Sequence, residues 1–190
     1  MSFLVLSYPE LSPGDHAWIQ SVRAEHDTQY EIVGPHFTFV FPVSRLNQET
    51  FVAHARNQAR GQAGFSFVLR SAVVVKDAFS ASAHVFLVPD EGYSTMVELH
   101  DRLYTGPFAA ELRLDIPFIP HLTVGNAADA QACKWLADDL NARGVSIRGD
   151  INALDAAQYE GGRVESVERI ELAVTPESKK GLSKAGPLSF

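Results

Sequence analysis

The chain has 190 residues, of which 46% are hydrophobic and 21% charged, and its formal net charge is −7 at pH 7. This size and composition are typical of a soluble protein with a substantial core, so we expect a single domain over residues 1–190. The negative charge disfavours a protein that holds long nucleic acid through its phosphates, because such binding needs many Lys and Arg side chains on one face. A small anionic ligand or an RNA end needs only a local positive site in a cleft and is compatible with this charge.

The start of the chain and its cysteine content indicate a cytoplasmic protein. Residues 1–15 hold a short apolar run without the basic lead-in or the small-residue cleavage site of a signal peptide. No apolar stretch of the sequence is long enough to span a membrane. The single cysteine, Cys133, cannot form an internal disulfide or a thiolate-rich metal site, and we expect it to be a small buried side chain on a helix.

The chain begins with the pattern of one strand and two helices. A strand over 3–8 is followed by a helix over 12–27, which Ser12 caps at its N-terminus. A second helix begins after Asn47 and ends at Gly61. Its apolar stripe consists of Phe51, Val52, Ala55 and Ala59.

Strands and helices continue to alternate in the rest of the chain. Strands over 65–76 and 84–89 are rich in β-branched and aromatic residues, and the turn-prone stretch between them predicts a hairpin. The remaining predicted elements are a helix over 94–104, a strand over 118–125, a helix from Asp129 to about Arg143, and strands near 146–154 and 167–174. Residues 176–190 are polar and rich in Gly and Pro, which predicts a loosely held terminus.

One pattern, Pro-His-apolar-Thr-apolar, occurs twice, as PHFTF at 35–39 and as PHLTV at 120–124. The two histidines are separated by close to half the chain length, and a weak internal repeat of that period predicts two similar lobes that face each other. A bare His-x-Thr is common by chance, but the fuller pattern repeated at this spacing is not. A third copy, His26-Asp27-Thr28, lies at a polar helix end without the flanking residues, and we interpret it as a coincidence.

In an extended strand, successive side chains point to opposite faces. We therefore expect His36 and Thr38 on one face of their strand, and His121 and Thr123 together on one face of theirs. Each strand would press its other face on the core of its own lobe. The aromatic residues of the first strand are expected on that core face: Phe37, Phe39 and Phe41.

Two such strands that face each other across a groove could enclose a tetrahedral phosphate. The hydroxyls of Thr38 and Thr123 would donate to its non-bridging oxygens, while His36 and His121 would flank the phosphorus. One imidazole would act as general base on a water or a ribose hydroxyl, and the other as general acid on the departing oxygen. Histidine suits both roles because its ordinary pKa of about 6.5 leaves both protonation states available near neutral pH.

The segments HFTF at 36–39 and HLTV at 121–124 resemble the motifs of the two-histidine (2H) phosphoesterases, which include the 2′-5′ RNA ligase and 2′,3′-cyclic phosphodiesterase proteins. The order of predicted elements is similar to the fold of that family over most of the chain. The resemblance implies an α+β fold of the LigT type, with two lobes, two antiparallel sheets and flanking helices around a central cleft. It also implies a pseudo-twofold duplication within the one domain.

The same resemblance implies a phosphoesterase that uses no metal and no other cofactor. His36 would be the proton donor, His121 the proton acceptor, and Thr38 and Thr123 the phosphate clamps. The implied substrates are cyclic or 2′-5′-linked phosphodiesters, and the acidic balance of the chain favours a small cyclic nucleotide over an RNA end. We expect a monomer that has no membrane partner.

Three other interpretations stay open. The same fold could hold a nucleotide without turnover, as a binding module, or it could carry RNA 2′-5′ ligase activity. A metal could activate water, as in a metallohydrolase, although no His-x₃-His, cysteine pair or nearby carboxylate completes a ligand set. Two complete His and Thr pairs favour the enzyme, because pure binding has less need of two proton-transfer groups.

Other side chains are candidates for secondary roles or for none. Four further histidines are expected at surface or capping positions: His16, His54, His84 and His100. Four cations are candidates for phosphate binding, most of them expected to be solvated: Arg70, Lys76, Arg102 and Arg163. Four aromatic residues are candidates for stacking on a base: Phe41, Phe79, Tyr104 and Phe118.

Overall fold

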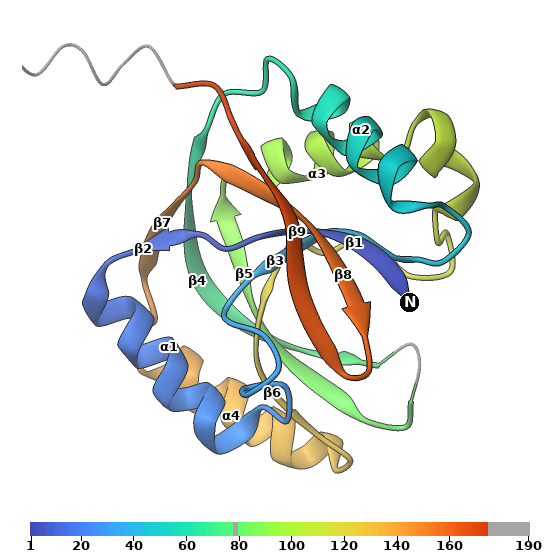
Figure 1. The fold of residues 1–190 in the computed structure, drawn as a ribbon. Coiled ribbons are helices and arrows are strands. Elements are labelled where there is room, and N and C mark those ends of the chain that lie inside the picture. The colour runs from blue at the N-terminus through green and yellow to red at the C-terminus, as the bar shows by residue number, and fades with distance from the viewer. Residues whose placement is uncertain (78–79, 175–190) are drawn as a thin grey trace, which may run out of the picture.

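The computed structural model describes residues 1–77 and 80–174, and its strands form two antiparallel sheets (Figure 1). The terminus predicted over 176–190 and the stacking candidate Phe79 lie outside the described residues. Sheet A has four strands in the order β3-β1-β8-β9. In that order they span Phe37–Val43, Ser2–Ser7, Ala153–Glu160 and Arg163–Glu171.

Sheet B has five strands in the order β2-β7-β4-β5-β6. In that order they span Glu10–Leu11, Ile147–Ile151, Phe65–Lys76, Ala83–Glu91 and Leu122–Ala127. The predicted hairpin is present, because β4 and β5 pair from Lys76 and Ala83 at its tip to Val68 and Glu91 at its base. The α+β fold with two antiparallel sheets that the resemblance implied is confirmed.

Each sheet is covered by two helices (Figure 1). The helices α2, Gln48–Ala59, and α3, Tyr93–Leu103, pack against strands of sheet A, whereas α1, Pro13–His26, and α4, Ala130–Ala142, pack against strands of sheet B. A short 3-10 helix, η1, spans Gly106–Glu111 after α3. No helix within the described ranges is long and apolar enough to cross a membrane.

The helices begin and end at local signals in the sequence. Ser12, Asn47 and Asp129 each accept a hydrogen bond from a backbone N–H of the first turn, at 3.1, 2.9 and 2.9 Å. Gly61 and Gly144 follow α2 and α4 with φ values of 77° and 66°. This left-handed backbone strains other residues, so a glycine there ends a helix at low cost.

The two lobes are not the two halves of the sequence. The strand β1 belongs to sheet A, whereas β2 and the helix α1 that follows it belong with sheet B. The helix α3 follows β5 of sheet B but packs on β3 of sheet A. The chain therefore passes repeatedly between the two sheets, the last time at Asn152, between β7 and β8.

Both lobes share one core, so the expected pair of separate lobe cores is wrong. A single cluster of buried side chains runs from Phe3 in sheet A to Leu87 in sheet B and includes residues of all four helices. The rings of Phe37 and Phe67 join the two sheets edge to face, with centroids 5.0 Å apart. Cys133 is 3% exposed on α4, as predicted for a small buried side chain.

Two predicted strands differ from the structure, and one hairpin was not predicted. The strand expected near 146–154 is divided into β7 and β8 by the crossing between sheets, and the hairpin of β8 with β9 was not predicted. The strand expected from 118 begins only at Leu122. Pro120 has no backbone N–H to donate to a ladder, so pairing starts after it.

Candidate active site

One cavity of about 720 Å³ is lined by both His-x-Thr pairs. Thr38 lies on β3 of sheet A, with His36 directly before that strand, and Thr123 lies on β6 of sheet B, with His121 directly before it. The ends of β4 and β5 and the segment 115–119 complete the walls. The structure therefore brings together all four residues that the sequence singled out, from two sheets and two distant parts of the chain.

Both imidazoles are held by the same local contact. Nδ1 of His36 lies 2.8 Å from the carbonyl oxygen of Gly34, and Nδ1 of His121 lies 2.5 Å from that of Ile119. A carbonyl oxygen can only accept a hydrogen bond, so Nδ1 carries the proton and donates on both rings. Nε2 is then a bare acceptor in each neutral ring and a donor in each protonated ring, as acid–base chemistry requires.

The surroundings of the two imidazoles differ. The ring of Phe86 stacks on His121 with centroids 3.5 Å apart and an angle of 13° between the planes. Tyr8 meets His36 only edge on, at 6.2 Å and 61°. Phe86 lies directly opposite Thr123 in the pairing of β5 with β6, so one wall of the cavity is aromatic. Although the motif is duplicated, its two histidines therefore have unequal environments.

Burial lowers the pKa of both histidines. For His36 the nearby charge of Arg23 adds to this lowering, whereas the hydrogen bond to Gly34 and the charge of Asp27 oppose it. For His121 burial lowers the pKa to about 4, with the hydrogen bond to Ile119 opposing the shift and the charges of His36 and His84 adding to it. Both rings are thus neutral at pH 7.

Phe41 does not lie on the core face where strict alternation placed it. Phe37 and Phe39 are each 1% exposed in the core, as expected, but Phe41 is half-buried and lines the cavity with His36 and Thr38. The pairing of β1 with β3 shifts register in this part of the strand. Such a bulge breaks the period of two, so Phe41 turns to the face that carries the motif residues.

His84 is not a surface or capping residue as predicted but part of the cavity wall. Its ring stacks on Phe86 at a centroid distance of 5.7 Å, and its Nε2 lies 3.7 Å from a carboxylate oxygen of Asp77. His84 and Phe86 alternate along β5, which pairs with β6 next to the second motif. That alternation was visible in the sequence, but the pairing partner of the strand was not.

The other histidines lie outside the cavity. His16 is exposed on α1, and Nε2 of His54 lies 3.0 Å from the carbonyl oxygen of Leu103 at the end of α3, so the expected surface and capping positions are found there. His100 is different, because it is 4% exposed and its Nδ1 donates to the carbonyl oxygen of Phe39. This histidine covers the open edge of β3, the outermost strand of sheet A.

Of the four candidate cations, Lys76 lines the cavity. The guanidinium of Arg70 instead binds the carboxylates of Asp90 and Glu91, and that of Arg102 donates to Gln62. Arg163 is exposed at the start of β9.

Two of the stacking candidates belong to the packing around β3 rather than to the cavity. Tyr104 is 6% exposed, and its hydroxyl accepts the backbone N–H of Phe41. The ring of Phe118 stacks on His100 at 3.6 Å. Among the described residues, the phenylalanines that line the cavity are therefore Phe41 and Phe86, of which Phe41 was a candidate.

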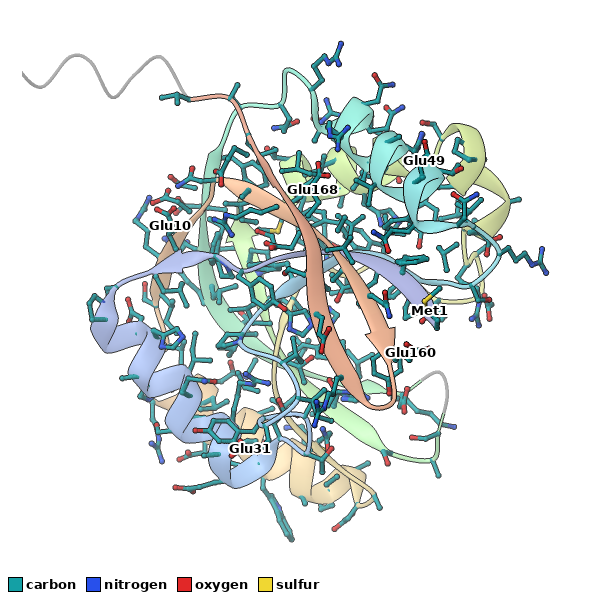
Figure 2. The ribbon with its side chains drawn as sticks, in the orientation of Figure 1. Met1, Glu10, Glu31, Glu49, Glu160 and Glu168 are labelled. Carbon is teal, nitrogen blue, oxygen red and sulfur yellow. The ribbon has the colours of Figure 1, made fainter. Side chains whose placement is uncertain are left out.

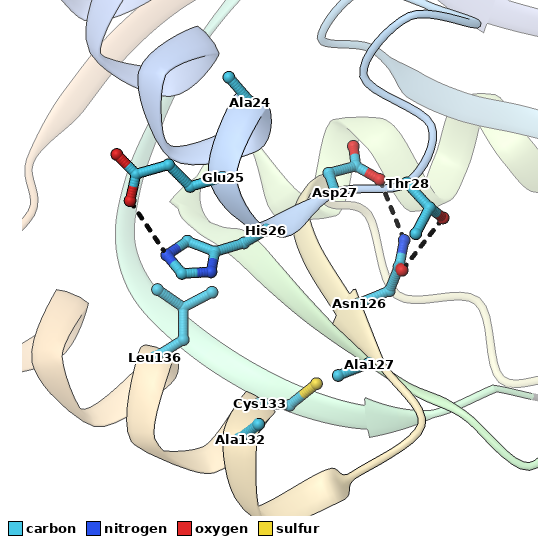
Figure 3. Close-up of a pocket in the computed structure, with 10 residues that line it drawn as sticks. All are labelled: Ala24, Glu25, His26, Asp27, Thr28, Asn126, Ala127, Ala132, Cys133 and Leu136. Atoms are coloured by element: carbon cyan, nitrogen blue, oxygen red, sulfur yellow. Dashed lines mark hydrogen bonds and ion pairs between the residues drawn. The ribbon is translucent and has the colours of Figure 1, made fainter.

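The third His-x-Thr copy does not join the other two. His26 and Thr28 line a separate cavity of about 450 Å³ between α1, β6 and α4 (Figure 3). The hydroxyl of Thr28 donates to the side-chain oxygen of Asn126, so it is engaged in a local contact. In the described part of the chain, no group of three or more His, Cys, Asp or Glu side chains is placed to hold a metal ion.

Comparison with known proteins gives a consistent picture of family and fold. A family model described as the 2′-5′ RNA ligase superfamily matches residues 11–163, which contain both motif pairs. No protein of curated function matches the sequence. Several solved structures match over 90% of this chain, and at these identities the likeness shows the fold alone. They include TT0787 of Thermus thermophilus (TM-score 0.59, 14% identity, 98% of that chain covered), E. coli LigT complexed with 3′-AMP (0.56, 18%, 97%) and Kluyveromyces marxianus Usb1 (0.54, 12%, 98%).

Proposed function

Because the chain belongs to the 2′-5′ RNA ligase superfamily, we propose that it is a phosphoesterase that hydrolyses a cyclic nucleotide or an RNA-terminal phosphodiester. His36 and His121 carry the protons, Thr38 and Thr123 bind the phosphate, and no metal takes part. The observation that carries this proposal is that both pairs line one cavity, with each Nδ1 bonded to a backbone carbonyl. This leaves Nε2 of each ring for proton transfer.

The reaction is an in-line displacement at phosphorus. Nε2 of one imidazole takes a proton from water as its oxygen attacks, and a new P–O bond forms. The P–O bond to the departing ribose oxygen breaks, and that oxygen takes a proton from Nε2 of the other imidazole. The hydroxyls of Thr38 and Thr123 donate to the non-bridging oxygens, where negative charge grows in the transition state.

The family resemblance supports an assignment of the two roles. The pKa of His121 falls to about 4, so this ring is neutral and can act as the base. Burial and the charge of Arg23 lower the pKa of His36, while the charge of Asp27 opposes this lowering, as the anionic phosphate of a substrate would. We assign His36 as the acid and His121 as the base, the direction that the family resemblance implies.

The size of the cavity and the charge of the molecule support a small substrate. A volume of about 720 Å³ lies in the range of sites for nucleotide-sized ligands. E. coli LigT has been crystallised with 3′-AMP, a nucleoside monophosphate of the kind that opening a 2′,3′-cyclic phosphate leaves. Acidic side chains are spread widely over the surface, as the labelled glutamates in Figure 2 illustrate, which disfavours long nucleic acid. A 2′,3′-cyclic nucleotide is the first substrate to test.

The test is hydrolysis of 2′,3′-cyclic nucleotides by the purified protein with and without a chelator, followed by chromatography of the products. We expect turnover that the chelator does not change. Loss of turnover with the chelator would identify a metallohydrolase, and tight binding without turnover would identify a binding module. A 2′-5′-linked product from two RNA ends would identify a ligase.

Substitution of the two histidines tests their roles in the same assay. His36→Ala and His121→Ala should each lower the rate by roughly 10² to 10⁴, because each removes a proton-transfer group. Circular dichroism should show an intact fold in both. His16→Ala, on the exposed face of α1, is the matched control and should keep the wild-type rate. Wild-type rates in either motif variant would contradict the proposal.

A further inference from the structure

A buried ion pair lies next to the segment that leads to His36. The side chains of Arg23 and Asp27 are 2% and 1% exposed, and Nε of Arg23 lies 2.8 Å from Oδ2 of Asp27. Removing two charges from water offsets much of their attraction, so such a pair contributes little stability compared with apolar side chains of similar volume. We therefore infer the role of this ion pair from its hydrogen bonds to the rest of the chain.

The pair holds the connection between α1 and β3. Nη2 of Arg23 donates to the carbonyl oxygen of Val33 at 2.7 Å, and Oδ1 of Asp27 accepts the backbone N–H of Gln29 at 2.9 Å. Val33 directly precedes Gly34, whose carbonyl oxygen accepts the Nδ1 proton of His36. A fixed carbonyl at Val33 thus lies one residue from the carbonyl that orients the imidazole.

The same network is attached to the strand of the second motif (Figure 3). The side-chain amide of Asn126 donates to Oδ1 of Asp27 at 3.0 Å and accepts from the hydroxyl of Thr28 at 3.1 Å. Asn126 lies on β6, three residues after Thr123. Two neighbouring residues of the third His-x-Thr copy, Asp27 and Thr28, therefore connect the approach to His36 with the strand that follows His121.

We propose that Arg23, Asp27 and Asn126 are positioning residues that fix His36 with respect to His121 across the cavity. This inference rests on the proposed acid–base function of those two histidines. The two imidazoles belong to different sheets, and the reaction needs both within reach of one phosphate. Displacement of a reacting group by about 1 Å can lower a rate about a hundredfold. A buried charged network with fixed hydrogen-bond directions limits such displacement more strictly than apolar packing does.

The decisive variant is Asn126→Ala, because it cuts the link between the network and β6 without leaving a buried charge unpaired. Asn141→Ala is the matched control. Like Asn126, Asn141 makes two hydrogen bonds through its side-chain amide, but its partners are the backbone N–H and carbonyl of Ala72 on β4, and it lies outside the cavity. Both variants should lose stability, and only Asn126→Ala should affect the chemistry.

Two readouts are measured for each variant. In the hydrolysis of a 2′,3′-cyclic nucleotide, Asn126→Ala should lower kcat by about tenfold to a hundredfold with little change in KM, because alignment matters most in the transition state. By NMR titration of the imidazole nitrogens, the pKa of His36 should differ from that in the wild type. Among the described residues, Tyr8, Arg23, Asp27 and His121 contact this ring or act on its charge. Four further charged or titratable groups line the same cavity: Lys76, Asp77, His84 and Asp115. Asn141→Ala should match the wild type in both readouts.

The variant Arg23→Lys separates the effect of the hydrogen-bond geometry of residue 23 from the effect of its positive charge. Lysine keeps the positive charge but cannot reproduce the fork that binds Asp27 and the carbonyl of Val33 together. We expect kcat to fall. A kcat and a His36 titration in Asn126→Ala that match those of Asn141→Ala would overturn the inference. If the wild type hydrolyses no cyclic nucleotide, the proposed function fails, whereas the titration of His36 needs no turnover and still decides the positioning role.

Discussion

The orientation of each motif imidazole follows from the residues directly before it. Pro35 and Pro120 separate the histidines from the carbonyls that accept their Nδ1 protons, at Gly34 and Ile119. A proline holds the residue before it in an extended conformation, which directs that carbonyl in a defined way. The proline also withdraws its own nitrogen from strand pairing, so both histidines stand just before their strands. The repeated Pro-His dipeptide is therefore part of the site geometry.

The lowered pKa values predict the pH dependence of kcat/KM, which reports the free enzyme. The rate should rise with pH as His121 loses its proton, near its pKa of about 4. It should fall again as His36 loses its proton, at a pKa below the ordinary 6.5. We expect a bell-shaped profile with its maximum on the acid side of neutrality, measured with a 2′,3′-cyclic nucleotide at constant ionic strength.

The profile of kcat provides the check on this prediction. A bound anionic phosphate stabilises a protonated imidazole, so the falling limb of kcat should lie at higher pH than that of kcat/KM. The two limbs belong to the coupled pair of histidines rather than to either one alone. A kcat/KM that is highest in alkaline solution would contradict the assignment of roles.

The residues of the site were predictable where they repeat a pattern and not where they depend on partners. The duplicated motif alone identifies four of these residues as candidates: His36, Thr38, His121 and Thr123. His84 carries no such signal, because only the pairing of β5 with β6 brings it beside the second motif. The positions of these side chains in one cavity depend on contacts between strands far apart in sequence, which local periodicity does not encode.

At the scale of elements, the close approach of α1 to β6 requires a glycine. A Cβ atom at Gly125 would lie 2.8 Å from Cδ2 of Leu136 and 3.3 Å from the carbonyl oxygen of His26. Leu136 could turn away, but the helix backbone at His26 could not do so without moving α1. Gly125→Ala should therefore lower the free energy of unfolding by about 1 to 3 kcal/mol, as overpacking does.

Urea unfolding followed by circular dichroism measures this loss. Gly14→Ala is the control, because a Cβ there meets only Oγ of Ser12 at an ordinary 3.9 Å. Gly14 lies in the first turn of α1, where alanine is the better helix former, so stability should be unchanged or higher. Equal midpoints for Gly125→Ala and the wild type would show that α1 does not press on β6 in this way.

Helices were more predictable than strands for a physical reason. A helix is specified by residues near one another, and the caps at Ser12 and Asn47 form as expected. The hairpin of β8 and β9 was missed because three of the five buried residues of β8 are alanines, Ala153, Ala156 and Ala157, which lack the β-branched signature of a strand. Ala156 and Ala157 become strand through pairing with β1, a contact between the two ends of the described chain.

At the scale of the whole molecule, repeated passage of the chain between the two sheets ties the lobes together. Each sheet is completed by segments from both halves of the chain, since β1 and β8 are neighbours in sheet A and β2 and β7 in sheet B. The duplicated motif predicted two facing lobes, but local patterns could not show on which lobe each helix packs. A cut between the sequence halves would therefore divide the strands of each sheet between the two fragments.

This arrangement predicts that the protein unfolds in a single cooperative transition. One core runs through both sheets, and Phe37 on β3 packs directly on Phe67 on β4, so neither lobe keeps its apolar surface covered once the other opens.

The chain offers a direct measurement, because its two tryptophans, Trp18 and Trp135, both lie on the helices that cover sheet B. Tryptophan fluorescence therefore follows that lobe, whereas far-ultraviolet circular dichroism follows the strands and helices of both. The two urea unfolding curves should superimpose, and calorimetric and van't Hoff enthalpies should agree. Separate midpoints would mean that the lobes unfold independently and that their shared core does not couple them.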